Sequence, residues 1–64
     1  MESELDMARR HVAQGRRHIA RQCQIIDELA GDDHDVTQAR ALLSELQVSQ
    51  ELHEQHLAAL LAAG

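Results

Sequence analysis

Branched apolar residues recur every seven positions in the first half of this chain, at Leu5, Val12, Ile19 and Ile26. The five-residue phrase Arg-Arg-His-(Val or Ile)-Ala repeats at the same interval, at 9–13 and 16–20. Because the chain has no proline, a seven-residue repeat places each residue type on one side of an α-helix. The repeat therefore predicts a helix whose apolar face needs a partner helix.

Capping signals divide the chain into two predicted helices. Ser3 is expected to cap a first helix of about residues 4–30, and Gly31 to end it in the left-handed conformation that glycine adopts without strain. The turn 31–33 contains two aspartates that compete to cap a second helix of about residues 34–62. The predicted fold class is therefore all-α, a single-domain antiparallel two-helix hairpin of the coiled-coil type.

A turn at this place fixes an antiparallel register, in which the numbers of facing residues add to about 65. This register pairs core-type positions in eight layers, namely Leu5 with Leu60, Ala8 with Leu57, Val12 with His53, Gly15 with Gln50, Ile19 with Leu46, Gln22 with Leu43, Ile26 with Ala39 and Leu29 with Val36. Small residues tend to meet larger ones, as a packed interface requires. The glycine in the fourth layer predicts the close approach of another backbone.

The second helix carries more apolar surface than one neighbouring helix can cover. A 64-residue chain also buries too little surface to be more than marginally stable alone. We therefore predict an interaction module that forms a homodimer, a four-helix bundle, or that binds a partner helix. The predicted interface consists of Ile25, Leu42, Val48, Ser49, Leu52, His56 and Ala59.

Composition argues against several other functions. The longest apolar run, Leu57–Ala63, is far shorter than the roughly 20 residues of a membrane span. The acidic start, Glu2 and Glu4, argues against a secretory leader, and the single cysteine, Cys23, is expected to be half-buried and fits a reducing compartment. We predict a cytoplasmic protein without a cofactor or small-molecule substrate. Enzyme activity is not expected, because a thin helical pair offers no pocket that shields a substrate from water.

Histidines suggest an alternative role as a metal-binding hairpin. His11, His53 and His56 would converge in the predicted register, and neutral imidazole is a good ligand for zinc, nickel and copper. The favoured interpretation is that these are polar flank residues at an interface, so no metal-binding residue is predicted.

Basic and acidic residues are segregated along the chain, although the net charge is −5. The segment 7–26 contains five arginines and no acid, whereas most acids follow it. Guanidinium groups can bind phosphates, so Arg10, Arg17 and Arg21 are candidate contacts for RNA. The acidic total and the absence of aromatic residues favour salt bridges to the second helix instead.

Several segments of the chain form a pattern that extends over both predicted helices, namely Arg10–Ala13, Gly15–Gln22, Ile26, Leu29, Asp33–Asp35, Ala39, Ala41–Leu43 and Leu52–His53. This pattern resembles short helical proteins of proteobacteria that have no assigned activity. At the turn the usual order is glycine, histidine, aspartate, whereas Asp33 precedes His34 here. The resemblance implies a stand-alone hairpin and transfers no functional residue. In size and plan the predicted dimer is also similar to the plasmid copy-control protein Rop, a hairpin dimer that binds RNA on its first helices, which is an analogy of architecture alone.

Overall fold

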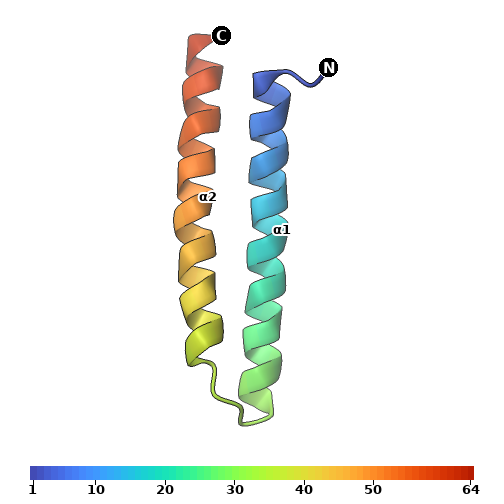
Figure 1. Cartoon of the computed structure of the whole chain (residues 1–64), viewed down its shortest axis with the longest axis vertical. Helices are drawn as coiled ribbons and strands as arrows, with labels where there is room; N and C mark the ends of the chain where they lie inside the picture. The colour runs from blue at the N-terminus through green and yellow to red at the C-terminus, as the bar shows by residue number, and fades with distance from the viewer.

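Two antiparallel helices make up the whole structure. A computed structural model describes all 64 residues and contains α1 (Glu4–Gly31) and α2 (Thr37–Ala63). The helices lie side by side along their lengths, with both chain termini at the same end (Figure 1). The molecule measures 49 × 19 × 14 Å, and neither helix has an apolar stretch that could cross a membrane. The predicted two-helix hairpin is confirmed.

The first helix begins where the capping signal predicts. Ser3 has an extended backbone (φ −76°, ψ 164°), and its Oγ accepts a hydrogen bond of 3.0 Å from the main-chain amide of Asp6. This bond satisfies one of the amide groups that lack a partner within the first turn of a helix. Glu4 and Asp6 also place carboxylates at the positive end of the helix dipole.

The turn is longer than predicted, and other residues shape it. Gly31 is still helical, and the left-handed conformation falls on Asp33 (φ 59°), whose short polar side chain tolerates it. Neither Asp32 nor Asp33 caps α2. The helix begins later than predicted because the amide and hydroxyl of Thr37 both donate to Oδ1 of Asp35, at 2.9 and 2.7 Å. These two hydrogen bonds lower the pKa of Asp35, the one from the hydroxyl most strongly.

Contacts between the helices agree with the predicted register. Every residue of the eight predicted layers is buried or half-buried. Two glutamines also cross the interface, since Gln50 Nε2 donates to the carbonyl of Val12 at 2.9 Å and Gln22 Nε2 donates to the carbonyl of Ala39 at 2.8 Å. Because each of these bonds joins a side chain to the main chain of the other helix, they oppose sliding of one helix along the other.

The apolar core is small. Ala8, Val12 and Ile26 are the buried apolar residues, and Gln22 and Gln50 are the buried polar ones. Apart from Ile26, the larger aliphatic side chains of the interface are only half-buried, because a single neighbouring helix covers a side chain from one direction only. A hairpin of this kind therefore leaves a large part of its apolar surface in contact with water.

Candidate interaction surface

Residues predicted to form the interface lie exposed on one side of α2. Each of them is three, four or seven positions from another member, so they share a helix face. We call them the α2 stripe: Leu42, Val48, Ser49, Leu52, His56 and Ala59. The exposed fractions of Leu42, Val48 and Leu52 are 46%, 58% and 61%. Ile25 of α1, the remaining predicted interface residue, is half-buried. The hairpin's own packing therefore leaves the α2 stripe without a partner.

A shallow groove of about 420 Å³ lies on this stripe. Its lining consists of Ser44, Glu45, Val48, Ser49 and Leu52. Glu45 is its one ionisable residue, and it is not a member of the predicted interface. Its position seven residues before Leu52 is the signal that would have placed it there, because residues seven apart share a helix face.

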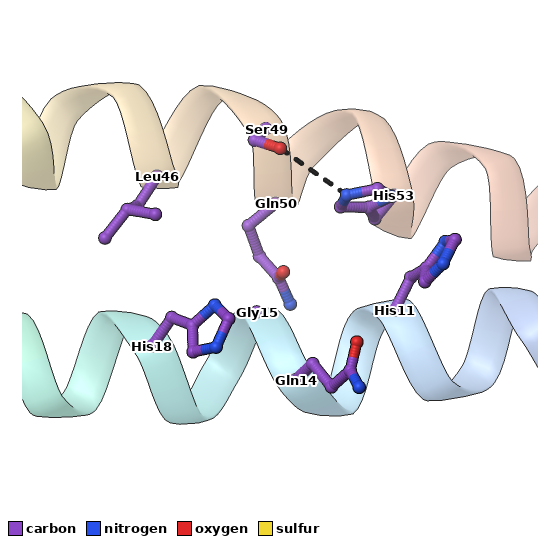
Figure 2. Close-up of a pocket in the computed structure, with 8 residues that line it drawn as sticks. All are labelled: His11, Gln14, Gly15, His18, Leu46, Ser49, Gln50 and His53. Carbon is purple, nitrogen blue, oxygen red and sulfur yellow. Dashed lines mark hydrogen bonds between the residues drawn. The ribbon is translucent and has the colours of Figure 1, made fainter.

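A polar pocket of about 130 Å³ lies between the two helices near their middle (Figure 2). Both helices line it, with His11, Gln14, Gly15 and His18 from α1 and Leu46, Ser49, Gln50 and His53 from α2. The ring centroids of His11 and His53 are 5.1 Å apart and their planes are tilted by 55°. Ser49 Oγ lies 3.4 Å from Nε2 of His53, which holds that ring from its own helix.

Gln50 extends from α2 toward Gly15 and fills the space above it (Figure 2). A Cβ on Gly15 would lie 2.7 Å from Cδ of Gln50 and would collide with its Oε1. The glycine was predicted to admit another backbone, but a side chain occupies the space instead. While Nε2 of Gln50 donates to Val12, Oε1 is buried without a hydrogen-bond partner. The glycine thus makes room for a polar contact between the helices.

The three histidines of the metal hypothesis do not come together as predicted. His11 packs against His53, whereas Nε2 of His56 lies 3.6 Å from Oε1 of Glu4. No group of three or more histidine, cysteine, aspartate or glutamate side chains is placed to hold a metal ion. Because zinc sites generally use three or four protein ligands, we propose no metal site within this hairpin.

The arginines of the RNA hypothesis contact mainly their own chain. Nε and Nη2 of Arg10 donate to the two carboxylate oxygens of Glu2 at 2.8 and 3.0 Å, which lowers the pKa of Glu2 and raises that of Arg10. Nη1 of Arg21 donates to Oε1 of Gln24 at 3.1 Å. Arg17 is the member of the predicted set that makes no side-chain hydrogen bond or ion pair in this structure.

Cross-helix salt bridging, predicted from the charge segregation, is present at the middle of the hairpin. Nη2 of Arg16 lies 3.6 Å from Oε1 of Glu54. Both side chains are largely exposed, so the pair stabilises the hairpin by about 0–1 kcal/mol. Cys23 was predicted to be half-buried but is exposed, because the facing helix does not extend over that flank of α1.

Comparison of this chain with protein-family models, with curated proteins and with solved structures finds no match. Function must therefore be inferred from the surface of the hairpin itself. On that surface, the α2 stripe is a set of residues on one helix face that the packing of α1 against α2 leaves exposed.

Proposed function

We propose that this protein is an assembly module whose hairpins associate through the α2 stripe into a four-helix bundle. The observation that carries the proposal is the exposure of Leu42, Val48 and Leu52 on one helix face, where Val48 and Leu52 line a groove that contains one carboxylate. Contiguous apolar patches on a protein surface generally mark sites of contact with another molecule. A second copy of the hairpin is the simplest partner, since it supplies the same apolar surface.

The energy available from this face can be compared with the cost of association. Full burial of a valine or leucine side chain stabilises by about 1.5–3 kcal/mol, so a side chain already half-covered contributes about 0.8–1.5 kcal/mol. Six such side chains, three from each copy, contribute about 5–9 kcal/mol. Association costs about 4–15 kcal/mol in lost freedom of motion. Because the two quantities are similar, the dimer is expected to depend visibly on protein concentration.

RNA binding is less well supported than self-association. Two of the three candidate arginines, Arg10 and Arg21, are engaged by Glu2 and Gln24 of the same chain. The net charge of −5 also opposes the approach of a polyanion. The proposal is therefore confined to protein contacts.

Replacement of Leu52 by glutamate tests the proposal, with Leu61→Glu as its matched control. Both leucines are on α2 and similarly exposed (61% and 51%), but only Leu52 belongs to the stripe. Because Leu52→Glu would place a charge inside the proposed interface, we expect light scattering to give a mass near the 7.2 kDa of one chain. Wild type and Leu61→Glu should both give twice that mass. A wild-type protein that stays monomeric up to ~1 mM would refute the proposal.

A further inference from the structure

We infer that two hairpins dock with α2 of one copy antiparallel to α2 of the other, about a two-fold axis close to Gln50 and Glu51. This inference rests on the proposed function, since it concerns the geometry of the same surface. A two-fold interface is self-complementary, so if one residue contacts a second, that second residue contacts the first on the other copy. We can therefore ask whether the surface of α2 is complementary to the same surface running in the opposite direction.

One row of the α2 surface has the heptad spacing of a helix interface. Its members follow one another at alternating intervals of three and four residues, namely Leu42, Glu45, Ser49, Leu52, His56 and Ala59. All six are exposed in the hairpin. In an antiparallel pair of identical helices, the numbers of facing residues add to a constant. If this constant is 101, every member of the row faces another member of the row.

Each layer formed in this way joins complementary side chains. The facing pairs are Leu42 with Ala59, Ser49 with Leu52, and Glu45 with His56. In two of the layers a large aliphatic side chain meets a small residue, which is the combination that fills an interface evenly. In the third layer a carboxylate meets an imidazole ring, whose N–H donates a hydrogen bond in either protonation state.

Parallel docking would give poorer layers from the same residues. Each residue would then face its own copy, so Glu45 would meet Glu45 and Leu42 would meet Leu42. Like charges facing each other destabilise an interface, and small residues facing small residues leave it unfilled. Antiparallel docking removes both defects without any additional residue. The separation of the two Glu45 carboxylates and their pairing with His56 therefore select a second, reversed copy as the occupant of the stripe.

His56 is already oriented in a way that suits this arrangement. Its Nε2 points toward Oε1 of Glu4 at 3.6 Å in the hairpin. The other ring nitrogen, Nδ1, is then the atom left for Glu45 of the second copy, and it donates to that carboxylate when it carries a proton. The two-fold axis creates this contact twice, once on each side of the central layers. Glu45 would thus be paired when the groove around it is covered.

Disulfide cross-linking distinguishes the two directions of docking. Single cysteines are introduced by Leu42→Cys and by Ala59→Cys in a Cys23→Ser background, and the two variants are mixed in equal amounts in a glutathione redox buffer. We expect the mixed disulfide to exceed either homodimeric disulfide by at least about tenfold, because only antiparallel docking brings residues 42 and 59 together. Leu61→Cys, outside the stripe, should cross-link no more than it does in denaturant.

The outcomes separate this inference from the proposed function. Homodimeric disulfides that dominate, or a statistical mixture of the three species, would overturn antiparallel docking while the light-scattering mass still reports a dimer. A wild-type protein that is monomeric by mass, together with no cross-linking above the denatured level, would overturn both. A dimeric mass without any of these disulfides would overturn the docking geometry alone.

Discussion

Replacement of Gly15 by alanine probes the contact at the middle of the hairpin. At an exposed helical position this change stabilises a protein by about 1 kcal/mol, because glycine loses more backbone freedom on folding. At Gly15 the new Cβ would collide with Oε1 of Gln50 and lie 2.7 Å from its Cδ. Since these atoms form the end of a flexible side chain, the amide is expected to swing out. It would then lose its hydrogen bond to the Val12 carbonyl.

The expected magnitude follows from what the displaced amide gains and loses. The hydrogen bond to Val12 contributes about 0.5–1.5 kcal/mol net, and burial of the side chain about 0.8 kcal/mol per methylene. Hydration of Oε1, which is unpaired in the folded hairpin, returns part of this loss. A net cost of about 1 kcal/mol cancels the helix gain, so Gly15→Ala should leave stability nearly unchanged. In a Gln50→Ala background the collision is absent, and the same change should stabilise by about 1 kcal/mol.

Urea unfolding of the four proteins of this double-mutant cycle, followed by helical circular dichroism at one chain concentration, measures the coupling between the two sites. Ala20→Gly serves as the control, because Ala20 is an exposed residue of α1. It should cost about 1 kcal/mol in both backgrounds. If Gly15→Ala stabilises equally with and without the Gln50 side chain, the proposed contact between Gly15 and Gln50 is refuted.

Two further predictions concern the helix ends. Ser3→Ala removes the hydrogen bond to the Asp6 amide and should lower the free energy of unfolding by about 0.5–2 kcal/mol. Ser3→Asp keeps a capping oxygen and should retain most of this stability. Equal stability of the alanine and aspartate variants in urea would contradict the prediction. Thr37→Val removes the hydroxyl that most strongly lowers the pKa of Asp35, so NMR titration should show that pKa rising toward 3.8. Because the folded pKa is lowered, this bond stabilises the protein above the unfolded pKa and is lost as pH falls through the folded value. The valine variant should therefore lose less stability in acid, and an unchanged Asp35 titration would show that the hydroxyl has no such effect.

Much of the fold could be predicted from the sequence, because helix formation and helix amphipathicity are local. The seven-residue repeat that contains Val12 and Ile19 defines which face of α1 is covered, and Ser3 marks where that helix begins. The same periodicity predicted that Leu42 and Leu52 lie outside the contact with α1, and both are exposed. These features depend on residues within a few turns of one another, so a single sequence contains them.

The conformation of the turn and the contacts of the residues around the pocket depend on tertiary structure. Asp33 is the residue that enters the left-handed region. The path that the chain takes between the two packed helices decides this. His11 packs against His53, whereas His56 lies beside Glu4. The partner of such a flank residue depends on the direction of its side chain and on axial offsets of less than one helical turn. The sequence by itself determined the faces of the two helices through their period. Only the packing of one helix against the other decided which side chains meet, because that choice depends on distances between residues far apart in the chain.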